Sequence, residues 1–164
     1  MKLIVTGTPG TGKTSIAGML AKKLGIKLIN ELAFAQKKRI GSIDRKTGER
    51  LIPLKKLEKA LKKELKANES LIVEGHLLCG LKLPADLIVV LRCSPKKLEA
   101  RLSGKRNYSD EKILDNAFCE ETGYCMLNAK ASYPKEKIIE AGNDRNLKNS
   151  FNSIVKELRK RNFL

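Results

Sequence analysis

The chain has 164 residues, the length of one compact domain, and 41% of them are hydrophobic, enough for a buried core without a disulfide or a metal. Its 34 Lys and Arg against 18 Asp and Glu give a formal charge of +16, which favours anionic ligands such as nucleotides or nucleic acid. A solvated lysine-rich surface would explain the same charge, whereas a low aromatic content of 4% argues against binding by base stacking.

Strands and helices alternate along the first half of the chain. We expect a strand over Lys2–Thr6, a helix over Lys13–Leu24, a strand over Ile26–Ile29, a helix over Glu31–Arg39 and a basic loop over Gly41–Arg50. The next helix has an apolar stripe at Leu54, Leu57, Leu61 and Leu65, and lysines cover the rest of it.

The same alternation continues to the end of the sequence. Continuous Ile, Val and Leu predict strands buried on both faces. We expect strands over Ser70–Val73, Leu87–Leu91 and Lys137–Glu140, and helices over Pro95–Leu102, Asp110–Ser132 and around Phe151–Leu158. This pattern predicts a single α/β domain, 1–164, with a three-layer, doubly wound, five-stranded parallel sheet that binds its ligands at the carboxyl ends of the strands.

The first strand is followed by a phosphate-loop motif, G-x-x-x-x-G-K-[ST], at Gly7–Thr14. Its glycines allow successive backbone N–H groups to point at one anion, and the helix N-terminus adds to that site. Lys13 is expected to reach the β- and γ-phosphates of a nucleotide, and the Thr14 hydroxyl to bind Mg²⁺. An ordinary glycine turn is the alternative interpretation.

An acidic residue and the chain's single histidine follow the third predicted strand. Glu74 comes directly after an apolar run, where phosphate-loop proteins hold Mg²⁺ directly or through water. Asp86 precedes the next strand and therefore belongs at the opposite edge of the sheet. His76 is placed to orient water or to respond to the metal near the γ-phosphate. A loop histidine satisfied by backbone hydrogen bonds would have the same spacing.

Three arginines follow the fourth predicted strand. Arg92 ends that strand on the expected nucleotide side, and Arg101 and Arg106 flank a short basic loop. Guanidinium groups there could neutralise charge on a transferred phosphoryl group. Arg101 could instead pair with neighbours such as Glu99 on the helix surface.

Location is predicted from the thiols and from the lack of apolar segments. Cys79, Cys93, Cys119 and Cys125 form no C-x-x-C pair, so reduced structural thiols are expected. No apolar run has the roughly 18 residues of a membrane helix. The apolar stretch at the start is too short for a secretory signal, and we therefore expect a cytoplasmic protein that does not contact a membrane.

Four segments together resemble the nucleoside monophosphate kinases, and more narrowly adenylate kinase isoenzyme six, the Fap-seven type. They are Thr6–Ser15 (TGTPGTGKTS), Val73–His76 (VEGH), Val90–Arg92 with Leu98–Tyr108 (LEARLSGKRNY), and Lys112–Glu120 (KILDNAFCE). The family usually has aspartate where this chain has Glu74, and the segment from Gln36 onward matches the family poorly.

The resemblance implies an adenylate kinase of broad nucleotide tolerance that also has ATPase activity and uses ATP and Mg²⁺. It implies an AMP-binding segment at about 30–53 and a short lid at about 105–115. The implied ATP ligands are Gly10, Gly12, Lys13, Thr14, Ser15 and Arg106, with Thr14 and Glu74 for the metal and Lys13, His76 and Arg106 for catalysis. It further implies a role in small ribosomal subunit maturation, through a ribosomal protein of the platform and through contact with rRNA.

Several functions therefore compete at this point. The first is phosphoryl transfer from ATP to a nucleoside monophosphate, with AMP as the expected acceptor. The second is an ATPase assembly factor that grips a ribosomal protein or RNA with little kinase activity, which the +16 charge favours. A small-metabolite kinase remains an alternative, whereas the lack of an N-K-x-D or T-K-x-D motif argues against a signalling GTPase.

Overall fold

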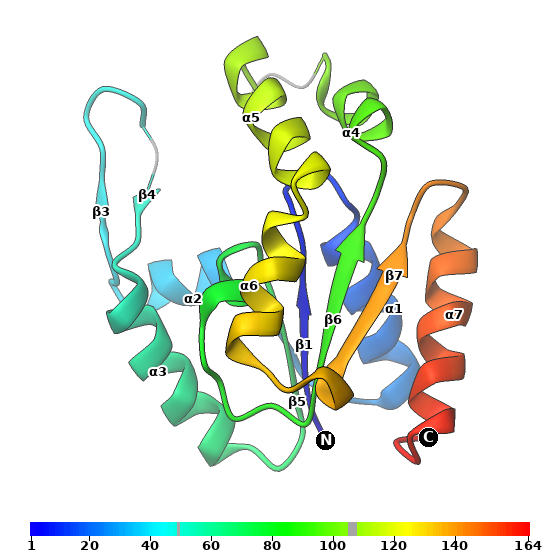
Figure 1. Ribbon diagram of the computed structural model, residues 1–164. Coiled ribbons are helices and arrows are strands. Elements are labelled where there is room, and N and C mark those ends of the chain that lie inside the picture. Colours follow the sequence, from blue (N-terminus) through cyan, green and yellow to red (C-terminus); the bar gives the residue numbers. More distant parts are fainter. Residues whose placement is uncertain (49, 105–107) are drawn as a thin grey trace.

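A five-stranded parallel sheet forms the centre of the computed structural model, which describes residues 1–48, 50–104 and 108–164 (Figure 1). Its strands are β1 (Lys2–Thr6), β2 (Leu28–Asn30), β5 (Leu71–Glu74), β6 (Leu87–Arg92) and β7 (Ile138–Gly142). They lie in the order β2-β5-β1-β6-β7, and every pairing between neighbours is parallel. The carboxyl ends of the strands therefore meet at one edge, where doubly wound sheets bind ligands. The predicted α/β fold is confirmed.

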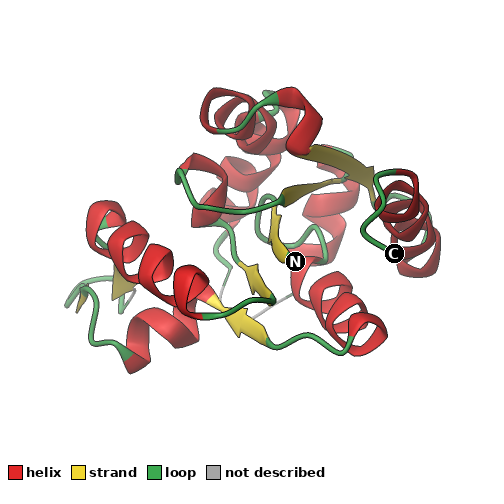
Figure 2. Ribbon diagram, turned by 90° about the horizontal axis from the view of Figure 1, so that it is seen from below, coloured by secondary structure: helices red, strands yellow, loops and turns green. Residues whose placement is uncertain are grey.

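Helices cover both faces of the sheet, so the protein has three layers (Figures 1 and 2). One face is covered by α1 (Lys13–Leu24) and α7 (Leu147–Lys160), and the other by α2 (Glu31–Lys37), α3 (Leu54–Ala67) and α6 (Tyr124–Ser132). Beyond the carboxyl edge lie α4 (Pro95–Leu102) and α5 (Asp110–Glu121). The short elements are the hairpin of β3 (Ser42–Ile43) and β4 (Arg50–Leu51) and the 3-10 helices η1 (Leu77–Gly80) and η2 (Lys135–Lys137). Among the described residues, no helix has the length and apolar character needed to cross a membrane.

Two apolar cores lie between these layers, one on each face of the sheet. Leu3 and Val5 of β1 belong to the core under α1 and α7, whereas Ile4 between them belongs to the core under α3 and α6. All three side chains are fully buried. A central strand covered on both faces needs apolar residues at every position, which explains the continuous apolar runs in the sequence.

The predicted single helix over Asp110–Ser132 is in fact the two helices α5 and α6. Gly123 separates them. Its φ is 68°, a left-handed backbone conformation that residues other than glycine rarely adopt. A Cβ on Gly123 would also lie 3.4 Å from the Arg92 guanidinium. The break allows α6 to pack on the sheet while α5 extends past its carboxyl edge (Figure 1).

The predicted loop over Gly41–Arg50 contains the β3–β4 hairpin, which projects from the body of the protein (Figure 1). Each strand has two residues, too few for an alternating pattern to be recognised in the sequence. Asp44 stabilises the turn, because its Oδ1 accepts the N–H groups of Lys46 and Thr47 at 2.8 and 2.9 Å. These hydrogen bonds lower the pKa of Asp44.

Three strands are displaced along the chain from their predicted positions. The predicted strands Ile26–Ile29, Ser70–Val73 and Lys137–Glu140 are replaced by β2, β5 and β7, which begin and end one or two residues later. The apolar pattern missed the ends of these strands because pairing continues through polar residues, as where Asn30 pairs with Glu74. β2 and β5 therefore carry polar side chains to the carboxyl edge.

The burial of α3 generates a stability prediction. Leu61 has no exposed surface, and it packs between Leu57 and Leu65 in the core under α3. Leu61→Ala should lower the free energy of unfolding by about 2–5 kcal/mol, because it removes buried methyl groups and leaves a cavity. Denaturant unfolding followed by circular dichroism measures the change. Lys59→Ala on the exposed side of α3 is the matched control and should change it by less than about 0.5 kcal/mol.

Candidate functional site

The loop between β1 and α1 is shaped to surround an anion at the carboxyl edge of the sheet. Gly10 and Gly12 have φ values of 90° and 100°, outside the range that other residues readily adopt. A Cβ on Gly12 would lie 2.6 Å from Nδ2 of Asn143. Thr11 tightens the turn, since its backbone N–H and its hydroxyl donate to the Thr8 carbonyl at 3.2 and 2.9 Å. Such a loop, continued by a helix N-terminus, can hold a phosphate group.

The Lys13 ammonium lies across this loop. Its Nζ donates to the Thr8 carbonyl at 3.0 Å, and the residue is only 9% exposed. Burial lowers the pKa of Lys13, whereas the carboxylates of Glu31 and Glu74 act in the opposite direction and raise it. When a phosphate binds, the Lys13 ammonium can exchange its hydrogen bond with the neutral carbonyl for one with a phosphate oxygen, which is the stronger acceptor.

Glu74, at the end of β5, faces the first turn of α1. Its carboxylate is 1% exposed, and Oε1 accepts hydrogen bonds from the Thr14 hydroxyl at 3.2 Å and from the Asn30 amide. Ser15 follows Thr14 and is exposed in the same turn. Mg²⁺ in kinases takes oxygen ligands from one or two side chains and the rest from phosphates and water. Thr14 and Glu74 fit that ligand set, although no described group of three or more His, Cys, Asp or Glu could hold a metal ion by itself.

Glu31, at the start of α2, holds the segment that follows Glu74. Its carboxylate is fully buried and accepts the backbone N–H groups of His76 at 2.8 Å and Leu77 at 3.1 Å. The His76 side chain makes a third contact, with Nδ1 2.8 Å from Oε1 of Glu31. The backbone N–H and the imidazole of His76 therefore both contact the same carboxylate.

Sequence reasoning did not identify Glu31 as a site residue. It treated this residue only as the start of a helix. The available signal was the one that identified Glu74, namely an acidic residue directly after a strand, at the carboxyl edge of a parallel sheet. The position of the strand end hid that signal, because the predicted strand ended at Ile29 whereas β2 ends one residue later, at Asn30, directly before Glu31.

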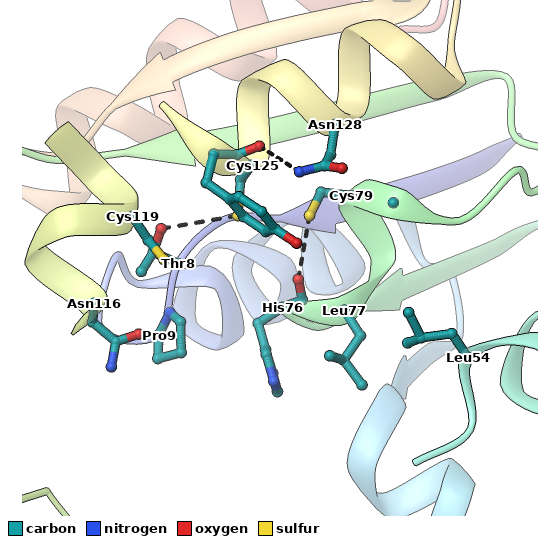
Figure 3. A pocket seen from close by; sticks show the side chains of 12 residues that line it. Thr8, Pro9, Leu54, His76, Leu77, Cys79, Asn116, Cys119, Cys125 and Asn128 are labelled. Atoms are coloured by element: carbon teal, nitrogen blue, oxygen red, sulfur yellow. Dashed lines mark hydrogen bonds between the residues drawn. The ribbon is translucent and has the colours of Figure 1, made fainter. Parts of the chain in front are cut away.

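A cavity of about 400 Å³ opens beside the phosphate loop (Figure 3). Thr8 and Pro9 of the loop form one side, and His76 lies next to them. The remaining wall comes from η1, α5, α6 and the start of α3, through Leu54, Leu77, Cys79, Gly80, Asn116, Cys119, Tyr124, Cys125 and Asn128. Three of the four free thiols thus lie in this wall. A volume of this size can hold a small organic molecule next to a phosphate on the loop.

Arg92 does not point freely toward the phosphate loop, as its position at the end of a strand had suggested. Its Nε donates to the Glu120 carboxylate at 2.8 Å, and a further contact with Glu140 measures 3.6 Å. Glu120 is 1% exposed and also accepts the Thr8 hydroxyl at 2.6 Å. These contacts from Arg92 through Glu120 to Thr8 fix the position of the phosphate loop relative to the end of β6. The sequence signal for Glu120 was a carboxylate on the buried stripe of α5, beside Ala117.

Of the other two predicted arginines, the structure describes Arg101 but not Arg106. Arg101 donates from one guanidinium nitrogen to the Asn143 carbonyl at 2.6 Å, rather than pairing with Glu99. Its other terminal nitrogen is buried without a hydrogen-bond partner in the structure. Asn143 donates in turn to the Thr11 carbonyl at 2.8 Å, so Arg101 reaches the phosphate loop indirectly. The predicted site residue Arg106, with the first part of the predicted lid, lies outside the described residues.

Comparison with known proteins places the chain among nucleotide-binding kinases. Residues 3–123 match the protein family described as “AAA domain”. A Pyrococcus furiosus protein named “Putative adenylate kinase” is 38% identical over 140 residues, which cover 85% of this chain and 73% of that protein. A Methanocaldococcus jannaschii protein of the same name is 31% identical over 161 residues, covering 97% and 86%. A sugar kinase structure from Janibacter sp. HTCC2649 shares the fold, with a TM-score of 0.64, 18% identity, and coverage of 96% of this chain and 94% of that chain.

The position of Lys13 generates a prediction about turnover. Lys13→Ala removes the buried cation from the phosphate loop, so phosphoryl transfer from ATP and ATP hydrolysis should both fall by at least about 100-fold. Nucleotide binding should persist in part, because the backbone N–H groups remain. Coupled-enzyme kinetics and calorimetric binding measure the two effects. Lys22→Ala, on the exposed side of α1, should leave both unchanged, and near-normal turnover of a folded Lys13→Ala protein would contradict the assignment.

The contact between Thr14 and Glu74 generates a prediction about magnesium. Glu74→Gln keeps the size of the side chain but removes its charge, so the Mg²⁺ concentration for half-maximal turnover should rise by about 10-fold or more. A magnesium titration at saturating ATP measures this. Glu69→Gln on the surface is the control. An unchanged magnesium profile would leave Glu74 with only a structural role.

Proposed function

The chain belongs to the family of its archaeal relatives that are named adenylate kinases, and to the AAA domain family, and we propose that it transfers the γ-phosphoryl group of ATP to AMP. The observation that carries this proposal is the cavity that begins at Thr8 and Pro9. It places room for a second molecule directly against the loop that would hold the phosphates of the first. A protein that only hydrolysed ATP would need no such space beside its phosphate loop.

The polar groups in the cavity wall favour an acceptor with an amino-bearing base. Asn116 donates its side-chain N–H to the Lys112 carbonyl at 2.6 Å, and Asn128 donates in the same way to the Tyr124 carbonyl at 2.9 Å. Each amide then has its oxygen as an acceptor for a ligand. The exocyclic amino group of adenine is a donor, whereas uracil presents carbonyl oxygens at the corresponding edge. This supports AMP and disfavours UMP.

Catalysis in this proposal consists of positioning and charge stabilisation. The ATP phosphates are bound by the loop at Gly10 and Gly12, by Lys13, and by the hydroxyls of Thr14 and Ser15. Thr14 and Glu74 would hold Mg²⁺, which when bound would neutralise charge on the phosphates. The Lys13 ammonium follows the phosphoryl group between donor and acceptor.

Two segments complete the proposed catalytic cycle. The segment at about 30–53, which includes the projecting β3–β4 hairpin, is proposed to bind AMP on the side of the cavity bounded by Leu54. The segment at about 105–115 is proposed as a lid from which Arg106 contacts ATP. Closure of both segments would exclude water from the transferred group.

Turnover of MgATP with and without each nucleoside monophosphate tests the proposal. ADP formed from AMP and phosphate released from ATP are measured separately in the same samples. We expect one ADP from each nucleotide in the presence of AMP, slower transfer to UMP, and phosphate release at a small fraction of the transfer rate. Phosphate release that is equally fast without any acceptor, with no transfer to AMP, would contradict the kinase proposal and favour the ATPase assembly factor.

A second function is supported by the exposed side of α3. Leu57, Leu61 and Leu65 are buried, and the opposite side of the helix carries Lys55, Lys56, Lys59, Lys62, Lys63 and Lys66. The carboxylates within this helix are Glu58, which pairs with Lys62, and Glu64, which contacts Lys27 at 3.4 Å. We propose that this basic surface contacts rRNA during small-subunit maturation in the cytoplasm, next to a platform ribosomal protein. The two functions are compatible, because α3 meets the cavity only at Leu54.

The basic surface of α3 generates a prediction about RNA binding. Binding to phosphates releases counterions, so affinity for small-subunit rRNA fragments should fall log-linearly with salt concentration. Lys59→Glu, Lys63→Glu and Lys66→Glu combined should abolish binding at low salt, while AMP phosphorylation stays within a few-fold. Fluorescence anisotropy with labelled RNA across a salt series measures this.

A charge-matched control separates α3 from the overall charge of the protein. Lys156→Glu, Arg159→Glu and Lys160→Glu change the net charge by the same amount on α7, at the other face of the sheet. These changes should weaken RNA binding much less than the α3 changes do. Equal effects of the two triple variants on RNA binding would contradict a specific role for α3 and would mean that its lysines form only a solvated surface.

A further inference from the structure

The contact between Glu31 and His76 assigns a role to a buried carboxylate that the catalytic scheme above does not use. Glu31 is 0% exposed, which is costly for a carboxylate unless all of its oxygens have partners. The partners come from one short segment 45 and 46 residues away in the sequence: the N–H groups of His76 and Leu77 and the Nδ1 atom of His76. The side chain therefore fixes both the backbone and the imidazole of that segment.

The backbone at Gly75 is shaped around this carboxylate. A Cβ on Gly75 would lie 2.0 Å from Cδ of Glu31, well inside the contact distance of two carbon atoms. Glycine is therefore the residue that allows Glu31 to approach between Glu74 and His76. This close approach leaves the carboxylate little freedom to move away from the imidazole.

His76 belongs to the lining of the cavity as well as to the contact with Glu31. The His76 side chain is 38% exposed and lies in the cavity wall beside Thr8 and Pro9 (Figure 3). The two nitrogens of an imidazole point in diverging directions, so Nε2 is available to a ligand when Nδ1 binds Glu31. Because a carboxylate only accepts hydrogen bonds, a proton on Nδ1 is the arrangement of neutral His76 that fits the 2.8 Å distance between Nδ1 and Oε1 of Glu31.

We propose that Glu31 is a positioning residue that holds His76 in the Nδ1–H tautomer and directs Nε2 into the cavity as a hydrogen-bond acceptor. In this arrangement Nε2 can accept a hydrogen bond from a donor group of a molecule bound in the cavity beside the phosphate loop. Free imidazole side chains prefer the opposite tautomer, so the carboxylate changes which atom meets the reacting groups. This role in turnover rests on the proposed function, whereas the tautomer itself does not.

The tautomer can be measured directly, because His76 is the only histidine in the chain. Nitrogen-15 and carbon-13 NMR of selectively labelled protein, in alkaline buffer where an imidazole is neutral, distinguishes the two forms. We expect the Nδ1–H form in the wild-type protein and a shift toward the Nε2–H form in Glu31→Ala. A wild-type protein in the Nε2–H form would overturn the proposal, and this result does not depend on the folding of any variant or on any activity.

A double-mutant cycle tests the role in turnover. Glu31→Gln should lower kcat for phosphoryl transfer from MgATP to AMP by about 10- to 100-fold, as expected for a residue that orients a histidine. The KM for MgATP should change little. The same substitution should have no further effect in a His76→Ala background, because Glu31 acts through His76. Additive effects would instead mean that Glu31 acts on Lys13, whose pKa it also raises, and would overturn the positioning role. Glu121→Gln, an exposed neighbour of the buried Glu120, is the control for loss of a carboxylate.

Discussion

Buried carboxylates at the carboxyl edge of the sheet are the constraint on which the rest of the site depends. Glu31, Glu74 and Glu120 have 0%, 1% and 1% of their surface exposed. A carboxylate in such a place is stable only if hydrogen-bond donors surround it. Here those donors are the backbone and side chains of the segments that line the proposed nucleotide site. Satisfying the buried charges and shaping the site are therefore one requirement.

Each of these carboxylates fixes a different part of the site. Glu120 binds Arg92 and the Thr8 hydroxyl and so supports the phosphate loop from the side of β6. Glu74 connects the first turn of α1 to β2, and Glu31 connects α2 to the segment after β5. Lys13 lies among them as a cation that is itself buried. Removing one carboxylate would leave buried donors without a partner, which is why neutral isosteric substitutions are the informative variants.

How much of the fold and of the candidate site the sequence predicts depends on how far apart in the chain the interacting residues lie. The phosphate loop and the five strands were predictable because their signals are local: a glycine spacing and continuous apolar runs. Gly123 was visible in the sequence, yet the apolar pattern on both sides of it suggested one helix, and only packing on the sheet explains the break. The roles of Glu31 and Arg92 depend on contacts 45 and 28 residues away, which no local pattern reveals.

The distribution of charge completes the physical description of the site. The protein carries a formal charge of +16, but its carboxyl edge buries carboxylates around Lys13. In the proposed function, the wider basic surface would attract an incoming nucleotide, and backbone N–H groups, Lys13 and the proposed Mg²⁺ would then hold its phosphates. Long-range attraction of this kind speeds the arrival of anions and weakens with salt, whereas the short hydrogen bonds of the loop do not depend on it. The basic surface and the acidic site thus act at different stages of binding, and a nucleotide kinase can use a large positive charge whether or not it also binds RNA.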